Sequence, residues 1–99
     1  MHVGNHLFLA HLKEKYPDSF VGAAVLELGS LDICGSVRPF FEPSHYAGVD
    51  IVTGPCVDIV TPAMHTAFKV DEFDTLISFS MFEHDPTWEQ SYVHNLQWL

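Results

Sequence analysis

The N-terminal segment carries apolar residues at the spacing of a helix. Phe8, Leu12 and Tyr16 recur every fourth residue, which places them on one face of a helix. Asn5 is a residue type that caps helix starts, and the "PDS" after Tyr16 interrupts the pattern. The sequence therefore predicts a helix from Asn5 to about Tyr16.

Four runs of apolar and β-branched residues predict strands. The run at 23–28, "AAVLEL", suits a strand covered on both faces, and the others occupy 46–52, 57–60 and 73–80. Strands that alternate with helices pair in parallel through right-handed crossovers. The pattern thus predicts an α/β fold with a Rossmann-like, doubly wound, mostly parallel sheet, whose ligand crevice lies at the carboxyl ends of the strands.

Two further helices are expected. Ser36 is a capping residue for a short helix over 37–42, and Pro39 falls in its first turn, where the missing N–H is not needed. Asp85 and Pro86 then form a helix start signal, and helical spacing continues to the last residue. We interpret the apolar residues of this last helix as a stripe that faces the core; they are Trp88, Tyr92, Leu96 and Leu99.

Composition limits the class of protein and of partner. The 99 residues give room for one domain, 1–99, and a content of 47% apolar and 17% charged residues is typical of a globular chain. Four basic and thirteen acidic residues give a net charge of −9, which repels phosphate backbones and anionic lipid headgroups. We therefore expect neither nucleic acid nor a membrane as a direct partner.

Cysteine and histidine spacing gives no sign of a metal site. Cys34 and Cys56 lack CxxC or zinc-ligand spacing, and the seven histidines contain no HExxH pattern. No signal peptide and no long apolar span is visible. We therefore expect a reduced, cytoplasmic protein that binds no metal.

The stretch "VLELGSLDICGSVR" at 25–38 breaks an apolar run with Gly29, Ser30 and Gly35. Because glycine lacks a Cβ, such a turn at the carboxyl end of a strand lets the backbone approach a ligand. Asp50 follows Gly29 by 21 residues, at the end of the second strand, where a carboxylate accepts hydrogen bonds from the two hydroxyls of a ribose. Together these features predict a cofactor of the adenosine type.

The glycine spacing separates two kinds of adenosine cofactor. A dinucleotide site uses G-x-G-x-x-G, in which the glycines make room for a pyrophosphate. Here "SLDIC" follows Gly29 directly, and the next glycine is Gly35. A nicotinamide-dependent oxidoreductase domain is therefore the less favoured alternative.

Three stretches, in this order, resemble the motifs of class I S-adenosylmethionine-dependent methyltransferases of the type 11-like group. "VLELGSLDICGS" is similar to the first motif, E-x-G-x-G-x-G, without its middle glycine, and "YAGVDI" to the second, which carries a ribose-binding acid. "FDTLISFSMFEHDPTWEQSYVHNL" is similar to the stretch from the fourth strand into the next helix. The resemblance covers residues 20–99. It implies that family's fold, truncated after the fourth strand and its helix, and methyl transfer to a small molecule or another unidentified acceptor.

The resemblance also implies which residues hold S-adenosylmethionine. Glu27 lies beneath its methionine end, Asp50 takes the ribose, and Ile51 flanks the adenine. His84, beside Glu83, is the candidate for a catalytic base or for a residue that lines the acceptor pocket. The other implied contacts are Gly29, Ser30, Leu31, Gly35 at the helix start, Ala63 and Ser78.

One position departs from the family's pattern. After the third strand the family often has an acidic residue before an alanine, and the acid holds the adenine amino group. Pro62 occupies that place here, so the backbone N–H of Ala63 is the adenine contact that remains.

A cationic cofactor suits the acidic side chains of the crevice. S-adenosylmethionine is positive at its sulfonium and ammonium groups, and Glu27 and Asp32 stabilise such charge. Structural roles stay open for the same residues: a buried pair for Glu27, a turn cap for Asp50 and a hydrogen-bonded core position for His84.

Function and assembly are left with alternatives. Methyl transfer asks a protein mainly to align the acceptor and exclude water, so no catalytic triad is needed. A non-catalytic fragment that keeps the fold is the second reading. The strand at 73–80 is expected at the edge of the sheet, with only Asp74 as protection against pairing. We therefore expect a homodimer that buries this edge or the helix at 88–99.

Overall fold

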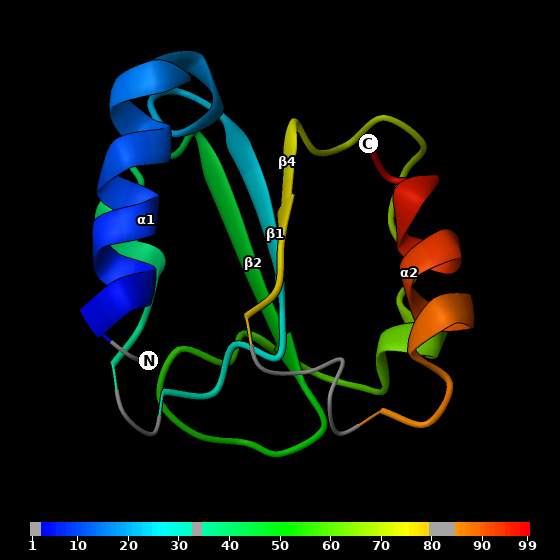
Figure 1. Ribbon diagram of the computed structural model, residues 1–99. Coiled ribbons are helices and arrows are strands. Elements are labelled where there is room, and N and C mark those ends of the chain that lie inside the picture. Colours follow the sequence, from blue (N-terminus) through cyan, green and yellow to red (C-terminus); the bar gives the residue numbers. More distant parts are fainter. Residues whose placement is uncertain (1–2, 33–34, 80–84) are drawn as a thin grey trace.

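The computed structural model describes residues 3–32, 35–79 and 85–99, which form an α/β fold around one sheet. All four strands are parallel and stand in the order β3-β2-β1-β4 (Figure 1). The predicted α/β fold with a parallel sheet is confirmed. The strands are β1 (Ala24–Leu28), β2 (His45–Asp50), β3 (Ile59–Val60) and β4 (Thr75–Ile77).

Helices flank the sheet on both sides. α1 (Val3–Lys15) lies on one side and α2 (Trp88–Leu96) on the other (Figure 1). None of the helices in the described ranges is long and apolar enough to cross a membrane. Three short 3-10 turns complete the structure: η1 (Pro17–Ser19), η2 (Arg38–Phe40) and η3 (Ala63–His65).

β1 is a central strand, paired with β2 on one side and β4 on the other. Glu27 stands opposite Gly48 of β2 and Ile77 of β4. The apolar side chains of β1 are buried, and Val25 and Leu28 are 0% exposed. Such burial is expected for a parallel strand covered on both faces, and it fixes the position of the turn that follows Leu28.

Alternate side chains of the sheet supply two separate cores. On the α2 side, Leu26, Leu28 and Val49 pack with Phe73 and Trp98. The core on the α1 side consists of Leu9, Phe20, Ala23, Val25, Val37 and Phe41. Because side chains of a strand alternate between its faces, Glu27 shares the α1 side with Val25.

The first helix differs from the prediction in its start and in its buried residue. α1 begins at Val3, so Asn5 lies inside it and is not its cap. Leu9 contacts the core, whereas Phe8 and Tyr16 are 54% and 52% exposed. The four-residue spacing placed Phe8, Leu12 and Tyr16 together correctly, but the core takes the adjacent face, where Leu9 meets the sheet.

The predicted core stripe of the last helix is wrong. Trp88, Tyr92 and Leu96 are exposed by 40% or more, whereas Ser91 and Asn95 are fully buried. The reason is a polar contact, because the Asn95 amide donates hydrogen bonds to the carbonyls of Ala63 in η3 and Ser91 in α2. The helix therefore turns this polar side, and not its apolar stripe, inward. Periodicity of apolar residues alone does not reveal such a polar seam.

The predicted short helix over 37–42 is only the three-residue turn η2. Ser36 Oγ accepts a hydrogen bond from the Arg38 N–H at 3.0 Å, but the cap position of η2 is Val37, which makes no side-chain cap bond. Phe41 then turns extended and stacks on Phe20, with 4.7 Å between ring centroids. The turn thus ends where this aromatic pair packs, and no α-helix begins within the described residues 35–42.

Candidate functional site

The carboxyl ends of β1 and β2 meet at the glycine turn. Gly29 has a φ of +75°, a conformation that favours glycine. The N–H groups of Gly29 and Ser30 both donate to the Val49 carbonyl, at 2.8 and 3.1 Å. The turn therefore folds over the end of β2, where Asp50 follows Val49.

Asp50 joins this turn to the end of its own strand. One carboxylate oxygen accepts the N–H of Leu31 at 3.1 Å, and the other accepts the N–H of Val52 at 3.2 Å. Asp50 is thus a turn cap, and it lies beside the glycine turn as predicted. A carboxylate has about four acceptor sites, so its two remaining sites are enough for two ribose hydroxyls.

Glu27 is a buried carboxylate on the α1 side of the sheet. It is 5% exposed, and Tyr46 donates its hydroxyl hydrogen to Oε1 at 2.6 Å. Burial raises the pKa of Glu27, and the nearby acids Asp32 and Asp50 add to that rise, against the opposing effects of Tyr46 and the Arg38 charge. The predicted alternative of a structural pair is therefore present, with Tyr46 as the partner.

Arg38 covers this pair. Its guanidinium lies 4.3 Å from the centre of the Tyr46 ring and bonds to Asp58 at 2.7 Å. Asp58 also accepts the Gly48 N–H at 2.7 Å. Burial works to raise the pKa of Asp58, but the Gly48 bond and the Arg38 charge outweigh it and lower that pKa. Burial and the adjacent Glu27 charge raise the pKa of Tyr46.

Sequence reasoning did not find Arg38, Tyr46 or Asp58 as parts of this site. They come together through the pairing of β1 with β2, which sets Glu27 opposite Gly48. The alternation of β2 was the available signal, because it places positions 46 and 48 on one face of the sheet. The alternation does not say which residue of β1 lies opposite, so the contact of Tyr46 with Glu27 could not be predicted from the spacing.

Gly48 lets these groups converge. A Cβ at this position would stand 2.7 Å from both Arg38 Nη2 and Ser30 Oγ, and it would overlap the Cys56 carbonyl oxygen. Gly48 has an ordinary strand conformation, so space rather than φ requires glycine here. The bare backbone of β2 thus forms the floor beneath Ser30 and Arg38.

Polar atoms with open hydrogen-bonding capacity lie at the site. Within the described ranges, Ser30 Oγ and Ser78 Oγ are buried and have no hydrogen-bond partner in the protein, and the same holds for Arg38 Nε. Buried polar groups are normally satisfied by protein, water or ligand. Ser30 belongs to the predicted cofactor turn and Ser78 follows β4, so both predicted residues offer a hydroxyl for a bound molecule.

The loop after β2 rests on the glycine turn. The Asp32 N–H donates to the Pro55 carbonyl at 2.9 Å, and the Leu31 side chain lies against Gly54. Ile51, at the start of this loop, is 69% exposed. An apolar side chain held beside Asp50 but open to solvent suits contact with a flat ring, as predicted for adenine.

Gly35 does not begin a helix. Its φ is +114°, and its N–H donates to the Asp32 carboxylate at 2.8 Å. The expected helix start at Gly35 is therefore wrong, because Asp32 closes a turn there instead; the expected contact of Gly35 with a cofactor stays a prediction. Asp32 then serves the turn with both its N–H and its carboxylate.

Ala63 is buried and held by α2. Its carbonyl accepts the Asn95 amide at 2.9 Å and the Thr66 hydroxyl at 3.3 Å. Thr66 in turn donates to Asn95 Oδ1 and accepts from the Trp98 indole. The loop predicted to contact adenine is therefore fixed from below by a buried polar network. Pro62 precedes it with an extended backbone.

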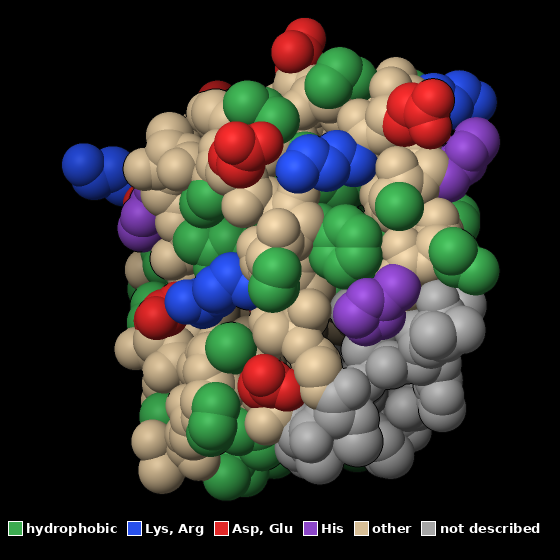
Figure 2. All heavy atoms as spheres, turned by 90° about the vertical axis from the view of Figure 1, so that its left-hand side faces the viewer, with side chains coloured by type: hydrophobic (Ala, Val, Ile, Leu, Met, Phe, Trp, Pro, Cys, Tyr) green, Lys and Arg blue, Asp and Glu red, His purple; other side chains and the backbone are tan. Residues whose placement is uncertain are grey.

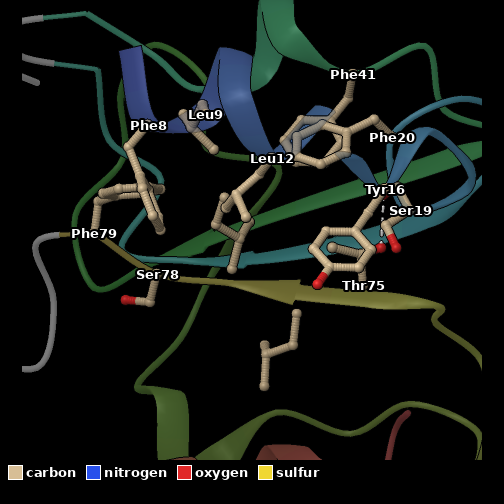
Figure 3. Close-up of a pocket in the computed structure, with 12 residues that line it drawn as sticks. Phe8, Leu9, Leu12, Tyr16, Ser19, Phe20, Phe41, Thr75, Ser78 and Phe79 are labelled. Carbon is tan, nitrogen blue, oxygen red and sulfur yellow. Dashed lines mark hydrogen bonds between the residues drawn. The ribbon is translucent and has the colours of Figure 1, made fainter. Parts of the chain in front are cut away.

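The candidate catalytic residue His84 lies outside the described residues, as does Cys34. Among the residues that the structure describes, no group of three His, Cys, Asp or Glu side chains is arranged to hold a metal ion. The described cavity of about 400 Å³ lies between α1 and β4 (Figure 3). Ser78 is one of its lining residues, whereas the described residues of the glycine turn, 29–32 and 35, are not.

The chain was compared with protein families, curated proteins and solved structures. No family model, no curated protein and no solved structure matches it.

Proposed function

We propose that this chain binds S-adenosylmethionine across the turn from Gly29 to Gly35 and acts as a methyltransferase. The observation that carries the proposal is the hydrogen bond from the Leu31 N–H to Asp50. It joins the glycine turn and the ribose candidate at the carboxyl ends of two neighbouring parallel strands. Ligands of open parallel sheets bind at such a place, and the strand order 3-2-1-4 is that of a Rossmann-like half-sheet.

The donor set fits the chemistry of this cofactor. Asp50 retains acceptor sites for ribose hydroxyls, and Ser30 offers a buried hydroxyl without a protein partner. Glu27 supplies a carboxylate whose burial raises its pKa. A cation nearby favours the ionised form of such a group, so the sulfonium or ammonium of the cofactor and Glu27 stabilise each other.

When bound, the cofactor would supply an activated methyl group, because breaking the S–CH3 bond of a sulfonium releases a neutral thioether, which is a good leaving group. The residues of this chain orient it: Asp50 holds the ribose, Ile51 covers the adenine, and the loop from Ile51 to Asp58 limits access of water. Ala63 is fixed by Asn95, which keeps the adenine edge in one position. Alignment of this kind accelerates transfer without a nucleophile from the protein.

Calorimetry with S-adenosylhomocysteine tests the site. A hydrogen bond to a charged group contributes roughly 1.5 to 3 kcal/mol, so Asp50→Ala weakens binding by about ten- to a hundredfold. Asp50→Asn removes the charge but keeps one acceptor oxygen, which serves one of the two backbone N–H groups that Asp50 accepts. Urea unfolding of this variant without ligand measures how much of the effect is turn stability. Asp18→Ala is the matched control, because it removes the same charge from the exposed turn η1.

The outcomes distinguish the alternatives. Tight binding of NAD in place of S-adenosylhomocysteine supports the oxidoreductase reading. Cofactor binding without methyl transfer to any acceptor in a panel of small molecules supports a non-catalytic fragment. If folded Asp50→Ala binds S-adenosylhomocysteine as tightly as the parent chain, the ribose assignment is wrong.

A further inference from the structure

An apolar groove of about 400 Å³ runs between α1 and β4. Phe8 and Phe79 lie together at one end, Tyr16 lies near Thr75 at the other, and Leu12 lies between them (Figure 3). The lining includes no charged side chain, in a chain of net charge −9. Elsewhere on the α1 side, hydrophobic side chains lie between separate charged ones (Figure 2). The groove is therefore an uncharged strip on an acidic molecule.

β4 forms the edge of the sheet beside this groove. It pairs with β1 only, among the described strands. The Asp74 N–H donates to the Ala24 carbonyl, whereas the Gly29 N–H donates to Val49 of β2. Peptide groups of a strand alternate in direction, so Leu26, like Ala24, directs its N–H and C=O toward β4. In a parallel pair these groups bond to the residues on either side of the partner Leu76, so the N–H and C=O of Leu76 point away from β1. An edge of this kind is a template for another strand.

The strip is symmetric about its middle. Phe8 and Tyr16 lie one helical step of four residues on either side of Leu12, and both are more than half exposed. In a twofold contact with its axis normal to the sheet, two β4 strands meet antiparallel and both α1 helices lie on the same face. Phe8 of each copy then approaches Tyr16 of the other, with the two Leu12 side chains at the axis.

We infer that two copies of this chain pair through β4 and the α1 strip of Phe8, Leu12 and Tyr16, forming one continuous eight-stranded sheet. An isologous contact is the commonest form of oligomer. The lining favours a second copy as the occupant, because the strip of one copy meets the same strip of the other with no charged side chain at the contact. The proposal does not depend on cofactor binding.

The area of this side is sufficient for a stable dimer. A standard interface buries about 800 Å² on each partner, which is roughly an eighth of the 5975 Å² surface of this chain. α1 has 13 residues and is therefore about 20 Å long. The helix strip and the strand edge lie along one side of a molecule 32 × 29 × 23 Å in extent, so a contact of that size extends over most of this side.

Light scattering after size exclusion, at micromolar concentration, tests the assembly. The parent chain elutes with about twice the 11.2 kDa chain mass. Phe8→Lys places a charge in the strip and raises the dimer dissociation constant by about tenfold or more. Leu7→Lys is the matched control: Leu7 is the neighbouring residue of α1, is 70% exposed and does not line the groove. It leaves the dimer intact.

Three results overturn the proposal. They are a parent chain that stays monomeric, a Phe8→Lys dimer as tight as the parent, and equal loss of the dimer in both variants. If the parent chain is a monomer and binds an added apolar peptide, or an additional segment of chain, along β4, the groove has another occupant.

Hydrogen exchange gives a readout that needs no variant. The Leu76 N–H exchanges slowly at high protein concentration, where the edge is paired, and faster on dilution. The Leu26 N–H, inside the sheet, is the internal reference. Exchange at Leu76 that does not depend on concentration contradicts strand pairing in the dimer.

Discussion

The hydroxyl of Tyr46 donates a hydrogen bond to Oε1 of Glu27 across the β1–β2 pair, with 2.6 Å between the oxygen atoms. The bond satisfies a carboxylate that is almost fully removed from water. Burial still raises the Glu27 pKa, so ionisation of this group opposes folding. Such a residue is retained more readily for binding than for stability.

Glu27→Gln therefore stabilises the chain without cofactor at neutral pH. Because the folded pKa is raised above the unfolded value of 4.5, the contribution of Glu27 to stability is fully present below that value. It is lost as pH rises through the folded pKa. Urea unfolding gives a higher midpoint for Glu27→Gln at about pH 7 and the parent midpoint at about pH 4.

Glu14→Gln is the control, because Glu14 lies on the exposed surface of α1. The free energy of unfolding of Glu14→Gln stays within about 0.5 kcal/mol of the parent value at either pH. A destabilised Glu27→Gln at neutral pH means that Glu27 gains more from its partners than it loses by burial. Glu27→Gln also binds S-adenosylmethionine about tenfold more weakly if the carboxylate faces the cation.

Asn95→Ala destabilises the packing of α2 on η3. Asn95 is fully buried, and its amide donates to the carbonyls of Ala63 and Ser91 while its oxygen accepts from Thr66. Truncation leaves these groups without partners and opens a cavity. The free energy of unfolding falls by about 2 to 4 kcal/mol, as measured by urea titration followed by Trp fluorescence.

Gln90→Ala, on the exposed side of the same helix, changes the free energy of unfolding by less than about 0.5 kcal/mol. Similar effects of the two variants would show that the network around Asn95 contributes little beyond the helix itself.

Gly48→Ala destabilises the sheet through contact rather than backbone strain. The added Cβ overlaps the Cys56 carbonyl and crowds Arg38 and Ser30. The expected loss is about 1 to 3 kcal/mol, and it is measured by thermal unfolding. Gly22→Ala is an informative comparison, because its Cβ meets nothing within 4 Å but its φ is +75°. Its cost is about 1 kcal/mol, from conformation alone.

If the Gly48→Ala protein is as stable as the parent, position 48 has room for a Cβ. In that case the loop that carries Cys56 and Asp58 moves at no cost, and it does not hold the floor of the site in place.

Salt strengthens the proposed dimer. Each chain carries a net charge of −9, and the two charges repel across a strip that has no charged lining. Raising NaCl from about 0.02 M to about 0.5 M screens that repulsion. The dimer dissociation constant, from sedimentation equilibrium, therefore falls with salt. A constant that rises with salt points to attraction between opposite charges and to a different surface.

The positions and the parallel pairing of the strands followed from the sequence, but the faces of the helices did not. Apolar runs bounded by turn residues gave β1 and β2 within two residues, since burial on both faces leaves a continuous pattern. β3 and β4 are shorter than their runs. In α2 the apolar stripe lies outside, because the buried Asn95 donates a hydrogen bond to the Ala63 carbonyl of η3.

The candidate site was predictable where it depends on chain position. Gly29 and Asp50 end adjacent strands, so parallel pairing alone brings them together. The contacts among Tyr46, Arg38 and Asp58 depend on strand register and on the path of two loops. Those are properties of packing between distant segments, which residue spacing does not record.

The position of β4 beside β1 also sets an order of events during folding. Val25 pairs with Tyr46 of β2 and with Thr75 of β4, so the second contact closes a far longer stretch of chain. By the logarithmic dependence of closure entropy on length, it costs about 0.8 kcal/mol more than the first. We therefore expect β1 and β2 to pair first. Until β4 pairs, the other edge of β1 presents unpaired N–H and C=O groups. During that interval the chain is most exposed to aggregation, and faster pairing of β4 shortens it.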